Sequence, residues 1–111
     1  MKISARNRDG VTILEPQGKI TIGVGDVALR EAVTEALNTG SRSILINMAG
    51  VTTIDSSGVG ELVSTYTSVA NRGGKLKVCE MPSKIADILQ ITQLITVFEV
   101  YDSCDEAVQS F

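Results

Sequence analysis

Apolar residues recur at helical spacing in four parts of the chain. Over residues 26–38 they fall at i, i+3, i+4, i+7 and i+8, which places them on one face of a helix. The same kind of stripe predicts a second helix over residues 57–71, and a short third helix begins after Pro82. Ser103 with Glu106 three residues later is a capping-box pattern, so we expect a final helix that runs to the C-terminus.

Strand patterns alternate with these helices. Residues 2–8 and 11–15 flank Asp9-Gly10, a dipeptide typical of hairpin turns, and should pair antiparallel. Residues 43–48 are almost continuously apolar, which is typical of a strand covered on both faces in a parallel sheet. Residues 75–80 and 97–101 complete the set of strands.

The alternation predicts an α/β fold for the chain. We expect one small layered domain over residues 1–111, with a four- to five-stranded, mainly parallel sheet, an antiparallel edge and about four helices. Residues 18–25 should form a loop, and Pro16 should lie where the sheet needs no backbone N–H. Lys75 and Lys77 are expected on a solvated strand face, and Cys79 and Cys104 as buried, reduced thiols; these last four assignments rest on the strand pattern and on residue type.

Composition excludes several classes of function. Apolar residues make up 43% of the chain, which excludes general disorder, and the net charge of -3 excludes a basic footprint for nucleic acid. The chain has no His, which removes Ser-His-Asp and Cys-His catalysis and most zinc sites. We therefore expect no enzyme activity, no cofactor and no metal. No signal-peptide core or membrane-length apolar run is present, so a cytoplasmic protein without membrane contact is expected.

One hexapeptide stands apart from these patterns: Asp55-Ser56-Ser57-Gly58-Val59-Gly60. It follows the most apolar strand and opens the second helix. Asp and Ser at a helix start can simply accept hydrogen bonds from free N–H groups. The same position at the carboxyl end of a strand also suits a functional site, because helix N-termini favour anions such as phosphate. Both interpretations remain open on residue chemistry alone.

Two neighbouring features have weaker chemical interpretations. Gly23-Val24-Gly25 precedes the first helix but lacks the spacing of a phosphate-binding loop, so a flexible partner-contact loop is favoured. Glu61 could act as a base, but acids are favoured in the first turn of any helix, which makes that role the lesser interpretation.

The hexapeptide resembles the D-S-[ST]-G-[LV]-G signature of the STAS domain in bacterial anti-sigma factor antagonists. Nearly the whole chain follows the order of elements in that family. The resemblance implies a regulator that binds an anti-sigma factor and so frees a sigma factor. It also implies phosphorylation by that partner, a serine kinase using ATP, and removal of the phosphate by a serine phosphatase. The phosphoacceptor implied is Ser56, with Ser57 as second choice.

The resemblance also suggests a partner-binding surface. It combines the loop before the first helix with the start of the second, at Thr21, Ile22, Gly23, Val24, Gly25, Asp55, Ser56, Ser57, Gly58, Val59 and Glu61. The chain departs from the family pattern at Gly18-Lys19-Ile20-Thr21, where Thr21 stands in place of an expected Asp. The alternative function is a ligand- or nucleotide-binding STAS subunit of a transport-linked or stress-sensing complex.

Overall fold

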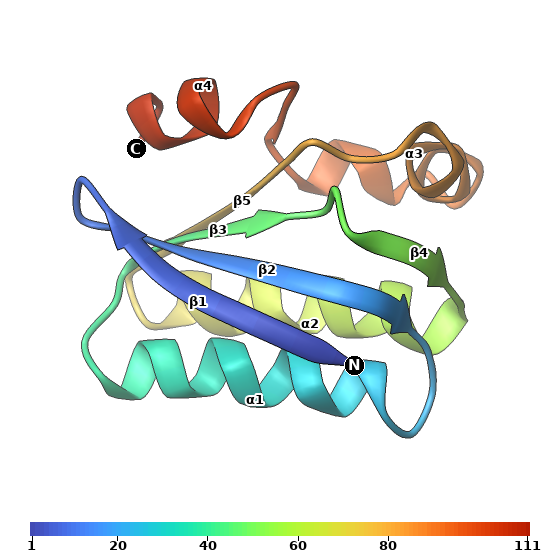
Figure 1. Cartoon of the computed structure of the whole chain (residues 1–111), viewed down its shortest axis with the longest axis horizontal. Coiled ribbons are helices and arrows are strands. Elements are labelled where there is room, and N and C mark those ends of the chain that lie inside the picture. The colour runs from blue at the N-terminus through green and yellow to red at the C-terminus, as the bar shows by residue number, and fades with distance from the viewer.

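The computed structural model describes residues 1–111 as a mixed sheet with helices on both faces (Figure 1). The strands are β1 (Lys2–Arg8), β2 (Val11–Ile20), β3 (Ser43–Asn47), β4 (Val51–Ile54), β5 (Lys75–Cys79) and β6 (Val100–Tyr101). The helices are α1 (Gly25–Asn38), α2 (Ser56–Asn71), α3 (Ser83–Ile91) and α4 (Cys104–Gln109), with a 3-10 turn, η1 (Leu94–Val97). Helices α1 and α2 lie together on one face of the sheet, and α4 lies on the other (Figure 1).

The sheet has the order β1-β2-β3-β5-β6, and β4 pairs separately with β2. Only β1 and β2 are antiparallel, joined by a turn in which Asp9 and Gly10 both have positive φ. The α/β fold with a mainly parallel sheet and an antiparallel edge is thereby confirmed, as are four helices. The sheet has one strand more than the upper expectation, because β4 was not anticipated. Its four residues contain two threonines, so its apolar pattern is weak.

Strand β2 is longer than the pattern predicted, so the expected loop over residues 18–25 is confirmed only for residues 21–24. The strand continues to Ile20 because it pairs in turn with two parallel partners, β3 at residues 12–14 and β4 at residues 18–20. Pro16 lies between these two ladders, where its missing N–H costs no bond to either. The remaining loop before α1 is therefore short.

Strand alternation divides the core between the two faces of the sheet. On β3, Ile44 and Ile46 face the larger cluster with α1 and α2, while Leu45 faces the smaller cluster with α4. All three side chains are fully buried. The prediction that this strand is covered on both faces is confirmed.

Lys77 is buried, so the expectation of a solvated side chain there is wrong. Residue Lys77 is 3% exposed, and its Nζ donates to the backbone oxygen and to Oγ of Ser110, each at 2.9 Å. The ring centroid of Phe111 lies 4.8 Å from Nζ, and Oε2 of Glu99 lies 3.7 Å away. A lysine can be buried when its charge is partnered in this way. Lys75 is exposed as expected.

The last strand is shorter than expected. The last strand covers only residues 100–101, because residues 94–97 form a 3-10 turn rather than the start of a strand. Cys79 and Cys104 are free and buried, as predicted.

No helix in the structure combines the length and the apolar character required to cross a bilayer.

Leu62 tests the packing of α2 on the sheet. It is 1% exposed within the larger core cluster, so Leu62→Ala should lower the free energy of unfolding by about 2–5 kcal/mol through lost transfer energy and a residual cavity. Ser68→Ala, on the exposed side of the same helix, should change it by less than about 0.5 kcal/mol. Urea unfolding measures both; equal effects would contradict the packing described.

Candidate functional site

Two chain segments far apart in sequence meet where β2 and β4 end. These strands are parallel neighbours, and Ile20 is the register partner of Ile54. The loop at residues 21–24 therefore leaves β2 beside the point where Asp55 leaves β4, at the carboxyl edge of the sheet. The structure thus brings together the two segments that sequence reasoning assigned to one surface.

The Asp55 carboxylate joins these segments directly. Its Oδ1 accepts a hydrogen bond from the backbone N–H of Gly58 at 2.9 Å, which caps the N-terminus of α2. Its Oδ2 accepts one from the backbone N–H of Ile22 at 3.0 Å, which holds the loop. These two bonds, the one from Ile22 foremost, lower the pKa of Asp55 below its ordinary value, because both favour the charged form.

Glycines allow the backbones at this junction to approach one another. A Cβ on Gly58 would overlap the carbonyl oxygen of Ile20, and a Cβ on Gly25 would overlap that of Lys19. By contrast, Gly60 has no atom within 4 Å of a Cβ position. The first glycine of the hexapeptide is therefore required by packing at this junction, and the second is not.

The residues proposed for partner contact differ in exposure. Ser56, Ile22, Gly23 and Val24 are exposed, with Ile22 at 72%. Thr21, Asp55 and Ser57 are half-buried, while Gly25, Gly58 and Val59 are buried and support the surface from below. The side chain of Glu61, which was also assigned to this surface, is only 10% exposed, and its Oε1 pairs with Nε of Arg30 at 3.0 Å.

A groove of about 390 Å³ borders Ser56 on the side that faces α3, which sequence reasoning did not assign to the site. It is lined by Ile54, Asp55, Ser56, Val59, Gly60, Ile88, Thr92 and Leu94. The last three come from α3 and the following turn. The sequence offers one signal near them: Ile91 lies off the apolar stripe of the third helix, and in the structure it is 82% exposed.

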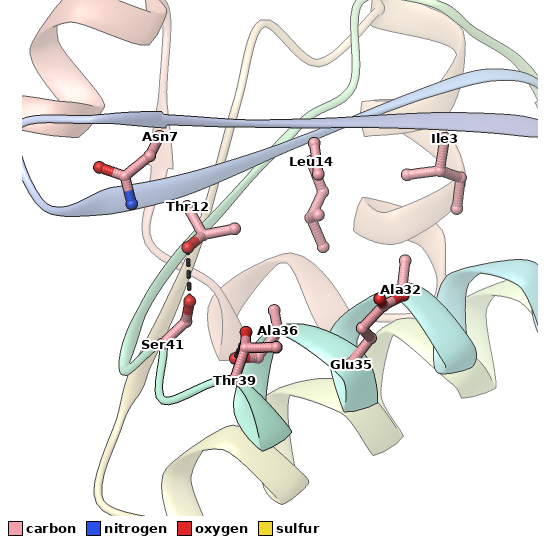
Figure 2. A pocket seen from close by; sticks show the side chains of 10 residues that line it. Ile3, Asn7, Thr12, Leu14, Ala32, Glu35, Ala36, Thr39 and Ser41 are labelled. Carbon is pink, nitrogen blue, oxygen red and sulfur yellow. Dashed lines mark hydrogen bonds between the residues drawn. The ribbon is translucent and has the colours of Figure 1, made fainter.

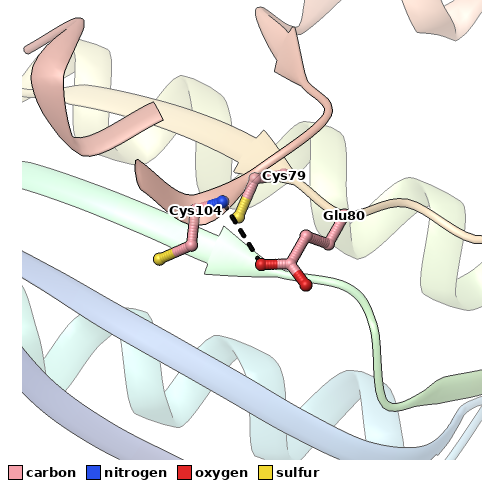
Figure 3. Close-up of side chains that lie close together, drawn as sticks. All are labelled: Cys79, Glu80 and Cys104. Atoms are coloured by element: carbon pink, nitrogen blue, oxygen red, sulfur yellow. Dashed lines mark hydrogen bonds between the residues drawn. The ribbon is translucent and has the colours of Figure 1, made fainter. Parts of the chain in front are cut away.

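Two other features carry candidate chemistry elsewhere in the molecule. A hollow of about 470 Å³ lies between β1, β2 and α1 (Figure 2). Glu35 is the one charged side chain that lines it. The hydroxyl groups of Thr12 and Ser41, which also line it, form a hydrogen bond with 2.6 Å between their oxygen atoms. The one group of potential metal-ligating side chains is Cys79, Glu80 and Cys104, on the α4 side of the sheet (Figure 3).

The family model described as the STAS domain matches residues 2–107, almost the full length of the chain. The chain belongs to the STAS domain family. The resemblance carried by the hexapeptide is thereby confirmed, and so is the predicted fold.

Several relatives of this STAS domain carry the name of anti-sigma factor antagonists. A Thermotoga maritima protein whose name provisionally assigns it to that class is 28% identical over 101 residues, covering 91% of this chain and 89% of the relative. The crystal structure of a Thermotoga maritima protein with the same provisional name superposes with a TM-score of 0.88 at 26% identity, over 97% of this chain and 92% of that one. The anti-sigma F factor antagonist of Paenibacillus polymyxa is 23% identical over 104 residues, covering 93% of this chain and 88% of the relative.

SpoIIAA of Bacillus, an anti-sigma factor antagonist solved in two states, has the same fold. Its unphosphorylated form matches with a TM-score of 0.72 at 14% identity, over 98% of this chain and 96% of that one. Its phosphorylated form matches with a TM-score of 0.74 at 15% identity, over 98% of each chain.

Asp55→Asn should release the loop of this STAS domain while keeping the cap on α2. The carboxamide oxygen can still accept from Gly58, but its NH2 group cannot accept from Ile22. Backbone hydrogen exchange at Ile22 should accelerate roughly tenfold, with little change at Gly58. Equal acceleration at both sites would contradict the two separate roles of the carboxylate.

The same variant gives a pH test with a defined sign. Because the native pKa of Asp55 lies below its ordinary value of 3.8, its contribution to stability is complete above that value and is lost as the pH falls through the native pKa. The difference in thermal unfolding midpoint between wild type and Asp55→Asn should therefore shrink at acid pH. A difference that grows on acidification would exclude this role.

Gly58→Ala and Gly60→Ala form a matched pair on one helix. Gly58→Ala should lower the free energy of unfolding by about 1–3 kcal/mol, because its Cβ forces α2 away from β2. Gly60→Ala should be neutral or raise it by up to about 1 kcal/mol, because alanine favours a helix interior. Chemical denaturation separates the two; a destabilised Gly60→Ala would count against the contacts described.

Proposed function

We propose that this STAS domain is an anti-sigma factor antagonist that binds an anti-sigma factor around Ser56 and is switched off by phosphorylation of Ser56. The observation that carries the proposal is the position of Ser56. It is the exposed first residue of α2, between the loop held by Asp55 and the groove formed with α3. A partner seated there contacts the serine and both flanks at once.

The flanks provide apolar surface for such a partner. Ile22 and Val24 project from the loop on one side, and Ile91 projects from the end of α3 on the other. Large exposed apolar side chains near one polar centre are typical of protein-binding surfaces. We infer that the partner buries these three residues and that Gly25, Gly58, Val59 and Glu61 act beneath the contact rather than in it.

Exposure favours Ser56 over Ser57 as the phosphoacceptor. The Ser56 side chain is open to solvent, whereas Ser57 is half-buried against the junction. A kinase must place the serine hydroxyl in line with the γ-phosphate of ATP, and an exposed residue at a helix start permits that approach. The amide N–H groups of the first helical turn then face the new phosphate.

Charge explains how the modification would act as a switch. The phosphate adds about -1.5 to -2 charges beside Asp55, whose carboxylate already carries one. Asp55 is neutralised in part by two backbone N–H groups, so the junction can retain its structure. Both the unphosphorylated and the phosphorylated form of SpoIIAA match the fold of this chain, which supports a modification that leaves the fold intact. The effect would fall on the partner, which meets new bulk and negative charge at the centre of its contact.

This function assigns the protein no catalysis of its own. The anti-sigma factor, acting as a serine kinase, supplies the phosphoryl group from ATP, and a serine phosphatase resets the protein. We infer that residues 1–111 act as one domain in the cytoplasm, where these partners and the sigma factor are found.

Serine variants test the switch. After incubation with ATP and an anti-sigma kinase from the same organism, mass spectrometry should place phosphate on Ser56 in wild type and in Ser57→Ala, and none on Ser56→Ala. Phosphorylated protein should bind the kinase about 5- to 150-fold more weakly than unmodified protein, a coupling of about 1–3 kcal/mol. Ser56→Ala should bind persistently, and Ser56→Asp should bind weakly.

The outcomes separate the parts of the proposal. Phosphate on Ser57 alone would overturn the residue assignment. Binding without any phosphorylation would overturn the switch but keep the binding surface. If the protein is neither bound nor phosphorylated by the kinase, the result would favour a ligand-binding STAS subunit of another assembly.

A further inference from the structure

Two cysteines from distant parts of the chain lie together on the face of the sheet opposite α1 and α2. Cys79 is the last residue of β5 and Cys104 is the first residue of α4. Their sulfur atoms and a carboxylate oxygen of Glu80 all lie within 4.8 Å of one another (Figure 3). Neither thiol has a part in the surface around Ser56, so their juxtaposition needs its own explanation.

Glu80 holds the two cysteines in this arrangement. Its Oε2 accepts from the backbone N–H of Cys104 at 3.2 Å and from Nδ2 of Asn47 at 3.1 Å. The residue adopts φ of +52°, a left-handed backbone that is uncommon for a side chain of this size. The turn after β5 therefore directs the carboxylate back toward the start of α4, which keeps Cys104 next to Cys79.

The two thiols have different environments. Cys79 is fully buried, and burial above all raises its pKa to about 12, so it remains a thiol. Cys104 is 9% exposed, and its sulfur accepts a hydrogen bond from Nη2 of Arg6 at 3.8 Å. Cys104 is thus the less buried of the two cysteines and has a cation beside its sulfur, so we expect an oxidant to react with it first.

The cysteines also stand at the two ends of a segment that reaches the groove beside Ser56. Residues 80–103 include α3 and the turn after it, which supply Ile88, Thr92 and Leu94 to the groove. A bond between the cysteines would close this segment into a loop and restrict its motion.

We propose that Cys79 and Cys104 form an intramolecular disulfide under peroxide, which tethers both ends of residues 80–103. Peroxide first oxidises the Cys104 sulfur to a sulfenic acid, and water is released as the O–O bond breaks. The Cys79 sulfur then forms the S–S bond as the S–O bond of Cys104 breaks. The departing hydroxyl leaves as a second water with the Cys79 proton, so two thiols are oxidised and one peroxide is reduced. Only the effect on partner binding rests on the proposed function; the disulfide does not.

A disulfide accounts for the cluster better than a bound metal does. Both hydrogen bonds to Glu80 use Oε2, so coordination through that oxygen would displace Asn47 and the first amide of α4. The guanidinium of Arg6 beside the Cys104 sulfur opposes a further cation but not a neutral disulfide. A metal ion is therefore the competing outcome of the test.

The test uses the full chain, treated with hydrogen peroxide, denatured and alkylated. Wild type should lose two hydrogens and take up no alkyl group, and peptide mapping should join residues 79 and 104 within one chain. The thermal unfolding midpoint should rise by at least about 5 °C, because the closed loop restricts the unfolded chain. Backbone NMR signals of Ile88 and Leu94 should shift on oxidation and return with dithiothreitol.

Cys104→Ser and Cys79→Ala are the matched controls, and neither should show the midpoint rise or the shifts at the groove. Two alkylated thiols after peroxide treatment of wild type, or a disulfide only between chains, would overturn the proposal. So would one zinc ion retained in native mass spectra of the wild type after zinc chloride is added, and absent from both variants. These readouts involve no partner, so their outcome does not depend on phosphorylation of Ser56.

Discussion

One carboxylate holds the candidate surface together. Asp55 accepts hydrogen bonds from Gly58, within its own helix, and from Ile22, at the end of another strand. The first bond caps the N-terminus of α2, and the second holds the loop before α1 against that terminus. Without this shared acceptor, no hydrogen bond would join the backbone of Ile22 to the start of α2, although the register of β2 and β4 would still place them side by side. With it, the exposed serine and the apolar tip of the loop form one continuous surface.

The carboxylate can bridge these groups only because the backbones around it lie very close. Gly58 and Gly25 each face a carbonyl oxygen of β2 with no room for a side chain. This approach in turn requires β2 to run on to Ile20 alongside β4, past the point where its pairing with β3 ends. The change of partner along β2, with Pro16 between the two ladders, is therefore what brings the end of β2 beside the start of α2.

The surface has two walls of different construction. The loop wall is short and is held by one charge-assisted hydrogen bond, from the backbone N–H of Ile22 to Asp55. The wall from α3 and the turn after it is packed on the core through Ile85 and Leu89, which are fully buried, and it leaves Ile91 exposed. The ends of this second wall lie at Cys79 and Cys104, on the far side of the sheet. Modification at Ser56 would therefore act beside the middle of this wall, and oxidation of the cysteines would act on its two ends.

The sequence by itself determined the α/β class, the helices, the double-sided burial of β3 and the position of Ser56 at a helix start. These follow from local periodicity, capping residues and a motif, all of which are written in neighbouring positions. It did not determine β4, the full length of β2, the burial of Lys77 or the groove with α3. Lys77 has the pattern of an exposed strand residue, and only the docking of α4 supplies Ser110 and Phe111 to cover it. Each of these features depends on a partner distant in sequence, so only the tertiary structure could decide it.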